Sequence, residues 1–348
     1  AGLESSAMRS APFLFALVPT LASCSASTFR ADAELLHART PSVEFKSGTG
    51  AFIVAPALQG RVMTAAVDPR GEGLAFVNRE VVNTPDKNAA FINYGGAERF
   101  WIGPESGPYA FFFSPGQEHT RDNWHAPAGL NTGAFKVTGQ TTEQLRMQRD
   151  LMLTNLAGTE FSMRVERLIE VPAAAEVAAA ASLGSITADA WTAFRSRTTV
   201  TNTGSRAWTR AGGLPCIWVL GMFKPGPRTW VIAPFRADAP DPDGGPAVRA
   251  DYFGQIPPER FRLGTNFAVF KADAKEVGKI GVLRERATDR IAAWDPQRRI
   301  FTLLVFGPVV ARAPYLSEHW GTTLPEPYYG DVVTSMIFTS CQYACPRT

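Results

Sequence analysis

The sequence predicts an all-β protein built from antiparallel sheets. From Val43 onward, short apolar and β-branched runs recur, separated by glycine, proline, aspartate and asparagine. This spacing is typical of sheet proteins. Long helical patterns are almost missing, and no linker rich in small or proline residues divides the chain. We therefore expect one large antiparallel β domain over residues 43–335.

The composition supports a large globular core and argues against a nucleic-acid partner. Of 348 residues, 45% are hydrophobic and 19% are charged, which is enough apolar material for a sizeable core. The 35 basic residues give a formal net charge of only +3 and form no run of four or more. Nucleic-acid binding normally needs a concentrated basic surface, so none is expected here.

Residues 1–23 have the pattern of a bacterial lipoprotein signal peptide. Met8-Arg9 gives a positive start, and Ala11–Leu21 is an apolar run too short to span a bilayer. Leu21-Ala22-Ser23-Cys24 resembles a lipobox, which predicts a lipid anchor at Cys24 in the bacterial envelope, periplasm or outer membrane. The alternative is an ordinary secretory signal cleaved nearby, with Cys24 incidental. Both predict export, and membrane fractionation of a Cys24→Ala variant distinguishes them.

A polar lead-in segment over residues 24–42, with a helical turn or two at Ala31–Ala38, precedes the domain, and an irregular tail over residues 336–348 follows it. Alanine-rich Ala173–Leu183 fits a loop insertion or a short helix. Within Thr159–Val171, apolar and polar residues alternate with a period of two until Leu168 breaks the parity. The expected strands are Ala51–Ala55, Gly60–Ala66, Leu74–Asn78, Val81–Asn83, Tyr109–Phe113, Phe135–Thr138, Leu145–Leu156, Thr159–Val171, Ala193–Asn202, Ile217–Phe223, Thr229–Phe235, Phe267–Lys271, Ile280–Arg284 and Ile300–Phe306.

The cysteines indicate no metal centre. Cys216 lies in an apolar run and is expected to be a buried thiol, while Cys341 and Cys345 are close enough for a bridge in an oxidising compartment. No histidine or second cysteine pair stands at metal-ligand spacing, so neither a metal nor another cofactor is expected.

The stretch Tyr94–Glu105 is the richest in groups that bind ligands. Its two adjacent glycines permit positive φ angles or a close backbone approach. Glu98, Arg99, Trp101 and Glu105 form a charged and aromatic set of the kind that lines a polar pocket. The structural alternative is that Arg99 pairs with Glu98 or Glu105 while Trp101 fills the core.

Strand alternation divides this set between two faces. If Glu98 to Trp101 end a strand, Arg99 and Trp101 share one face, and Glu98 shares the other with Phe100. The guanidinium and the indole are then the pair expected to face a ligand.

Four segments together resemble a family of uncharacterised bacterial exported proteins with a galactose mutarotase-like domain. They are Leu58–Thr64, Tyr94–Glu105, Ile217–Phe223 and Gly330–Val333. The resemblance covers roughly Val43 to Val333. It implies a galactose mutarotase-like β-supersandwich of antiparallel sheets, with a carbohydrate-sized cleft on a concave face.

The resemblance also implies which groups would carry mutarotase chemistry. Aldose mutarotases need a carboxylate base and a histidine acid across the cleft, and a histidine commonly precedes their Gly-Gly pair. Here that position is Tyr94. The remaining catalytic candidates are Glu326 and, in a polar loop, His119 and His125. The alternative for this loop is a solvated connection whose histidines have no special role.

Two functions follow from these observations. The first is an envelope protein that binds carbohydrate, in which Trp101, Trp124 and Trp320 stack on sugar faces while Arg99, Glu98 and Glu105 bind hydroxyl groups. The second is a sugar 1-epimerase or another acid/base enzyme that acts on carbohydrate.

Overall fold

The computed structural model describes residues 27–120, 122–186, 189–239, 246–252, 254–276 and 278–307, and the backbone of residues 331–337. These residues form seventeen strands and four short helices. Every pairing between the described strands is antiparallel, which confirms the all-β antiparallel prediction.

The helices are α1 (Phe29–Arg39), α2 (Arg79–Asn83), α3 (Ala128–Asn131) and α4 (Ala174–Ala180). The first nine strands are β1 (Val43–Ser47), β2 (Gly50–Ala55), β3 (Arg61–Ala66), β4 (Arg99–Gly103), β5 (Lys136–Gln140), β6 (Gln144–Thr154), β7 (Glu160–Glu170), β8 (Arg195–Asn202) and β9 (Cys216–Leu220). The others are β10 (Trp230–Pro234), β11 (Val248–Arg249), β12 (Phe261–Leu263), β13 (Phe267–Lys271), β14 (Gly278–Leu283), β15 (Arg290–Asp295), β16 (Ile300–Val305) and β17 (Asp331–Ile337).

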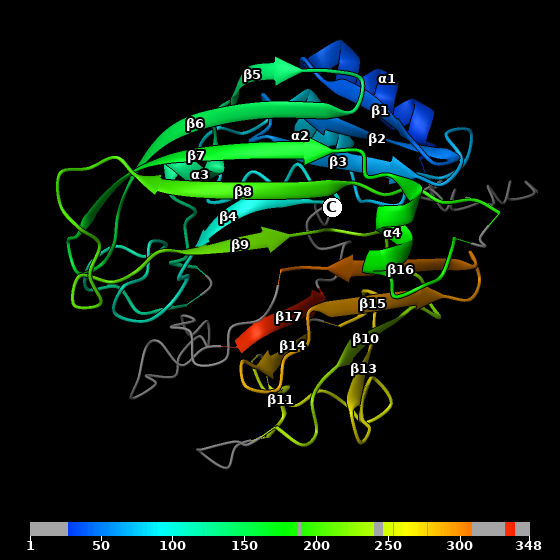
Figure 1. The fold of residues 1–348 in the computed structure, drawn as a ribbon. Helices are drawn as coiled ribbons and strands as arrows, with labels where there is room; N and C mark the ends of the chain where they lie inside the picture. The colour runs from blue at the N-terminus through cyan, green and yellow to red at the C-terminus, as the bar shows by residue number, and fades with distance from the viewer. Residues whose placement is uncertain are drawn as a thin grey trace, which may run out of the picture.

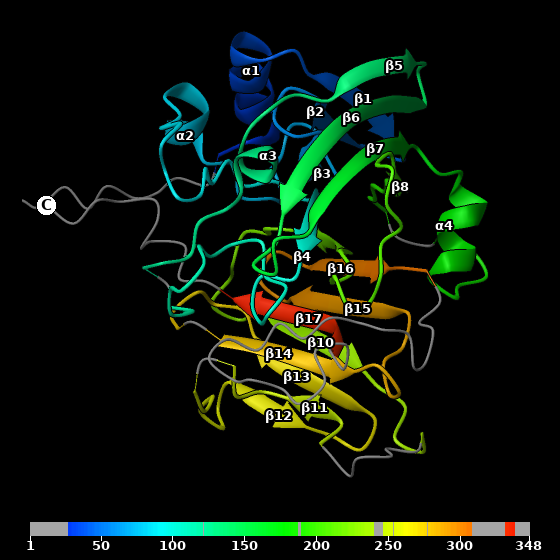
Figure 2. The ribbon, with the colours of Figure 1, turned by 90° about the vertical axis from the view of Figure 1, so that its left-hand side faces the viewer.

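The strands form five sheets in two regions of the molecule. Sheets β1-β2-β3, β5-β6-β7-β8 and β4-β9 make up what we call the N-terminal region, residues 27–223. Sheets β12-β13-β10-β15-β16 and β11-β14-β17 make up the C-terminal region, residues 224–337. In Figures 1 and 2 the N-terminal region occupies the upper half of the molecule and the C-terminal region the lower half, with β4 and α4 close to the boundary.

The N-terminal region holds the larger core. The four-stranded sheet and β1 to β4 enclose an aromatic-rich cluster that includes Phe52, Trp101, Phe112 and Phe161. A second cluster lies between α1 and the sheet β1-β2-β3, around Phe29 and Met63. The C-terminal region has a smaller apolar core around Phe270 and Ile280. The cleft described below lies in the N-terminal region.

The hairpin of β6 and β7 follows the expected period of two, with one informative difference. In β7, Phe161, Met163 and Val165 are buried and Arg164 and Glu166 are exposed, as predicted. The parity does not break at Leu168. The alternation continues, because Arg167 takes the buried position and Leu168 the partly exposed one.

Some of the expected strands are not strands. Val81–Asn83 belongs to α2, because the Asn78 side chain caps the helix by accepting a hydrogen bond from the Val81 amide at 3.2 Å. Leu74–Asn78 forms only isolated bridges with Phe223 and Gly95. Tyr109–Phe113 has irregular backbone, although Phe111, Phe112 and Phe113 are buried. This aromatic run therefore correctly indicated a core segment but did not indicate a strand.

The runs Ile217–Phe223 and Thr229–Phe235 are adjacent in the sequence but do not pair. β9 pairs with β4, whereas β10 pairs with β13 and β15 in the C-terminal region. The connection between β9 and β10 therefore passes from one region to the other. Cys216, expected to be buried, is only partly so at the start of β9.

Two expected helical segments form helices, and the last strand is longer than expected. The turn or two expected at Ala31–Ala38 belong to the longer helix α1, which Thr28 caps. The alanine-rich block contains helix α4. Strand β17 continues to Ile337, two residues into the segment expected to be irregular. No helix among the described residues is long and apolar enough to cross a membrane. The signal segment, Cys24, Trp320, Glu326, Cys341 and Cys345 lie outside the described residues.

Candidate functional site

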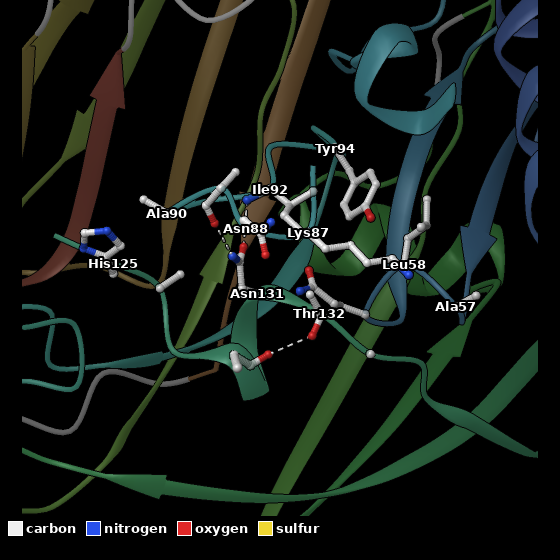
Figure 3. Close-up of a pocket in the computed structure, with 15 residues that line it drawn as sticks. Ala57, Leu58, Lys87, Asn88, Ala90, Ile92, Tyr94, His125, Asn131 and Thr132 are labelled. Atoms are coloured by element: carbon white, nitrogen blue, oxygen red, sulfur yellow. Dashed lines mark hydrogen bonds between the residues drawn. The ribbon is translucent and has the colours of Figure 1, made fainter. Parts of the chain in front are cut away.

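A cleft of about 610 Å³ opens beside Tyr94 (Figure 3). Three chain segments form it: the turn after β2, the stretch from Lys87 to Tyr94, and the segment around α3. Its size lies within the usual range for small-molecule sites, about 300–1,000 Å³. The lining residues are Ala57, Leu58, Gln59, Lys87, Asn88, Ala89, Ala90, Ile92, Tyr94, His125, Ala126, Ala128, Asn131, Thr132 and Gly133.

The glycine pair fixes the backbone that presents Tyr94. Gly95 and Gly96 have φ angles of 79° and 122°, as the sequence predicted. A Cβ atom on Gly95 would lie 2.0 Å from the carbonyl oxygen of Phe76, so no other residue fits this position. The Gly96 amide donates to that same carbonyl at 2.9 Å.

Beneath Tyr94 lies a fully buried arginine, Arg61 of β3. Its Nη1 donates to the Gly95 carbonyl at 2.7 Å, and its Nε donates to Gln59 Oε1 at 3.1 Å. The centre of its guanidinium lies 5.3 Å from the centroid of the Tyr94 ring, which is a cation–π distance. Burial lowers the pKa of Arg61 to about 9, so the group still carries its charge at neutral pH.

Gln59 connects this arginine to the opposite side of the cleft. Its Nε2 donates to the Leu130 carbonyl, and its Oε1 accepts from Arg61. Asn131 is tied in a similar way, because its Oδ1 accepts from the Ile92 amide at 2.7 Å and its Nδ2 donates to Ala89 at 2.9 Å. These two amides hold the cleft walls together.

The groups left to contact a ligand are Tyr94, Lys87, Asn88, Thr132 and His125. Among the described residues, the Tyr94 hydroxyl, the Lys87 ammonium and the side-chain amide of Asn88 have no hydrogen-bond partner in the protein, while the backbone amide of Asn88 donates to Asp86. Figure 3 shows the Lys87 side chain reaching across the cleft toward Leu58, on the side to which the Tyr94 hydroxyl points. The set offers donors and acceptors in roughly equal measure.

A second buried arginine engages Glu98, which was predicted to contact a ligand. Arg167 of β7 donates from Nη2 to both carboxylate oxygens of Glu98, at 2.6 and 2.5 Å, and from Nη1 to the Gly60 carbonyl at 3.0 Å. Both side chains are buried. Glu98 therefore acts in this structure as the counter-ion of Arg167 and not as part of the cleft lining.

Arg99 and Trp101 share a face of β4, as the alternation predicted, but this face is inside the protein. Arg99 is 5% exposed and Trp101 1%. The Arg99 guanidinium lies 4.0 Å from the Trp101 ring centroid and 4.6 Å from that of Phe91. Its Nε and Nη1 have no hydrogen-bond partner among the described residues. Neither side chain lines the cleft.

Glu105 belongs to the same buried cluster. It accepts a hydrogen bond from Trp101 Nε1 at 2.9 Å. Burial raises the pKa of Glu105, while that hydrogen bond and the charges of Lys279 and Arg99 oppose the rise. Burial also lowers the pKa of Arg99, as does the nearby charge of Arg61. Arg99 thus does not pair with Glu98, and Trp101 fills the core as the structural alternative proposed.

The structure separates the other candidates. Partly buried Trp124 stacks on Phe112 at 5.2 Å and meets Phe91 edge-on, so it extends the Arg99 cluster. His119 stacks on Phe113 at 4.2 Å and is 3.2 Å from the Ser106 hydroxyl, away from the cleft. Burial lowers the pKa of His119. Of the two histidines, only His125 lines the cleft.

The residues that form the cleft were mostly not among those predicted to bind a ligand. Tyr94 and Arg61 stood in the quoted segments, but neither was proposed as a ligand-binding residue. Lys87 and Asn88 lie in a polar turn with no distinctive spacing. Arg167 could have been found from its inward parity in an alternating strand, because a charged residue at a buried position requires a partner.

The comparisons with known proteins place the chain in a family. Residues 27–339 match the profile of a family of unknown function, DUF6786. The chain belongs to this family. No curated protein matches it. The DUF6786 chain is also similar to a solved galactose mutarotase-like protein from Lactobacillus casei ATCC 334, with 9% identity and a TM-score of 0.47, over 86% of this chain and 96% of that one.

The polar groups that line the cleft of this DUF6786 protein suit some kinds of chemistry and not others. None of its described lining residues is a carboxylate. No group of three or more histidine, cysteine, aspartate or glutamate residues in the described part of the chain is arranged to hold a metal ion. Amides, a phenol, an ammonium and an imidazole suit hydrogen bonding to a polar ligand.

Proposed function

We propose that this DUF6786 protein binds a carbohydrate in the cleft beside Tyr94. The supporting observation is the combination of a sugar-sized cleft with partnerless polar groups, the Tyr94 hydroxyl, Lys87 and Asn88, on walls held by buried amides. A polyhydroxylated ligand satisfies such groups, while small apolar residues such as Ala57 and Ala90 leave room for its ring. Together with the predicted export, this favours a carbohydrate-binding protein of the cell envelope.

Catalysis is the alternative function, as a sugar 1-epimerase or another acid/base enzyme. His125 is the observation in its favour: Nδ1 lies 3.1 Å from the Asn123 carbonyl and so carries the proton in that contact, which leaves Nε2 available to accept one. Ring opening also needs a base or acid on the other side of the sugar. The described lining residues contain no carboxylate, and Glu326 lies outside the described residues, which is why we favour binding.

The test is a titration of purified protein with common aldoses and uronic acids, followed by NMR. Replacing Tyr94 with Phe removes one hydroxyl and should weaken the binding of a sugar about fivefold, the value of one hydrogen bond of about 1 kcal/mol. Tyr109→Phe is the matched control, since its hydroxyl donates to the Ala211 carbonyl and does not line the cleft. Equal affinities of the wild type and both variants would place the ligand elsewhere.

The same spectra measure the exchange of anomers. If the protein only binds, anomers interconvert at the uncatalysed rate in its presence. Faster exchange that is lost in a His125→Ala variant would instead establish the enzyme.

A further inference from the structure

The positive charge of Lys87 in the cleft limits which class of carbohydrate binds there. Lys87 is the one described lining residue with a permanent charge, and it makes no ion pair within the described part of the chain. The neighbouring acid, Asp86, accepts a hydrogen bond from the backbone amide of Asn88 at 2.9 Å and does not line the cleft. A bound molecule near Lys87 therefore meets a cationic surface.

A second positive charge, that of Arg61, lies beneath the Tyr94 side of the cleft. Arg61 donates only to neutral acceptors, Gln59 and the Gly95 carbonyl. Glu98, the carboxylate whose charge acts on Arg61, is already held by Arg167. Arg61 is therefore a buried cation that no described carboxylate hydrogen-bonds, separated from the cleft by the Tyr94 ring. Its field passes through a low-dielectric interior, where charges are weakly screened.

Burial of such an excess of positive charge is costly unless something compensates it. Repulsion between buried positive charges also acts on Arg99: burial is the main cause that lowers its pKa, and the charge of Arg61 is the next. An anionic group in the cleft would offset this repulsion and would pair with Lys87 directly. A neutral sugar would do neither.

We propose that the carbohydrate bound in the cleft carries a carboxylate, as in a uronic acid or an oligosaccharide ending in one. This inference rests on the proposed function. The carboxylate pairs with the Lys87 ammonium, the sugar hydroxyls bond to Tyr94 and Asn88, and Arg61 strengthens the attraction from below without contact. Lys87 then determines specificity, and the buried amides Gln59 and Asn131 keep the walls at the required spacing.

The experiment compares ligands that differ only in charge. Glucuronate, its neutral isostere glucuronamide, and glucose are each titrated calorimetrically at about 50 mM salt, at which exposed charges still interact appreciably. We expect glucuronate to bind about tenfold tighter than glucuronamide, as one close ion pair at a partly exposed site allows. The galacturonate and galactose pair repeats the comparison for a second ring stereochemistry.

Two variants tie the preference to this cleft. Lys87→Gln should reduce the preference for the acid to about twofold and leave the affinity for glucose nearly unchanged, because the glutamine keeps a polar group of similar length. Lys275→Gln removes an exposed lysine of the C-terminal region and should leave both affinities unchanged. Circular dichroism checks that both variants remain folded.

The outcomes separate the inference from the proposed function. A preference for the acids that Lys87→Gln abolishes supports both. Equal affinity for glucuronate and glucuronamide overturns the acidic-ligand inference and leaves carbohydrate binding in place. A preference that Lys87→Gln does not change overturns the assignment to this cleft. Failure of every sugar to bind overturns both proposals.

Discussion

The two regions of the molecule differ in how far apart in the sequence the partners of their ion pairs lie. In the N-terminal region, two buried carboxylates pair with distant arginines: Arg167 and Glu98 are separated by 69 positions, and Arg79 and Asp32 by 47. Within the C-terminal region the partners are closer in sequence, although Lys224 and Arg298 also pair with Glu72 of the N-terminal region at 3.7 and 3.8 Å. Arg260 pairs with Asp273 at a separation of 13, and Arg298 with Asp295 in the same turn.

This difference corresponds to where the candidate site lies. A long-range pair in a core fixes the relative positions of strands, because any shift leaves a charge without its partner in a medium of low dielectric constant. Arg167 and Arg61 join β7 and β3 to the Tyr94–Glu98 segment, whose first residue lines the cleft. The local pairs of the C-terminal region stabilise turns and strand ends instead.

Among the large apolar side chains that are exposed, the aromatic ones lie mostly in the C-terminal region, where Phe301 is 59% and Phe267 is 44% exposed. The N-terminal core is packed with aromatic residues around charged ones. Two buried polar residues of this region, Gln59 and Asn131, line the cleft.

The largest expected effect comes from breaking the long-range pair. Glu98→Ala leaves the Arg167 guanidinium buried without its counter-ion, which costs about 3–5 kcal/mol of the free energy of unfolding. Urea denaturation followed by tryptophan fluorescence measures this loss.

The same strands supply the control for this variant. Arg164 and Asp150 form a pair at 2.8 Å across β7 and β6, on the exposed face. Asp150→Ala should leave the denaturation midpoint nearly unchanged, because exposed pairs contribute little. Similar losses for the two variants would contradict the view that burial, and not the ionic contact itself, makes the Glu98 pair important.

A local pair of the C-terminal region should show a smaller effect that depends on pH. Arg260 binds Asp273 in a fork, at 3.2 and 2.5 Å, and the Lys275 amide donates to the same carboxylate at 3.1 Å. Burial by itself would raise the pKa of Asp273, but these hydrogen bonds outweigh it and lower the pKa below the usual 3.8. Asp273→Asn should cost about 2 kcal/mol at pH 7, as expected for hydrogen bonds to a charged group.

The sign of the pH dependence follows from the lowered pKa. Below about pH 4 the unfolded chain takes up a proton at this position before the folded protein does, so the stabilisation by Asp273 is present above that pH and is lost as the pH falls further. The difference in unfolding free energy between wild type and Asp273→Asn should therefore shrink from pH 5 toward pH 2.5. A difference that stays constant over this range would show that Asp273 acts through shape and not through charge.

The sequence predicted the elements that depend on local pattern. The alternation in β6 and β7 and the apolar run of β13 are signals that neighbouring residues carry. Their strands appear with boundaries within a few residues of those expected. The Asn78 cap is local too, but the β-branched pair Val81-Val82 masked it, which is why α2 was interpreted as a strand.

The site was less predictable, because it depends on contacts between distant segments. Nothing near Glu98 indicates that its partner is Arg167, and nothing near Lys87 indicates that α3 lies opposite. Charged and aromatic composition singled out the Tyr94–Glu105 stretch, of which only Tyr94 lines the cleft. Within this stretch, strand alternation favoured Arg99 and Trp101 over Tyr94. Alternation tells which residues share a face of a strand, but not whether that face contacts a ligand or the core.

The smallest effect concerns Arg99 and tests whether its role is in packing or in binding. If Arg99 faced a ligand, as strand alternation suggested, Arg99→Lys would weaken sugar binding and leave the thermal midpoint nearly unchanged. In the structure, the planar guanidinium contacts both the Trp101 and the Phe91 ring, on which a compact and strongly hydrated ammonium cannot stack as well. We now expect Arg99→Lys to lower the free energy of unfolding by about 1 kcal/mol and to leave sugar affinity within about twofold of wild type, since the side chain is behind the cleft wall. Thermal unfolding and the NMR titration measure the two quantities on the same sample. An unchanged midpoint with strongly weakened binding would restore Arg99 as a ligand-binding residue, and would mean that the cluster of Arg99, Trp101 and Glu105 opens to admit the sugar.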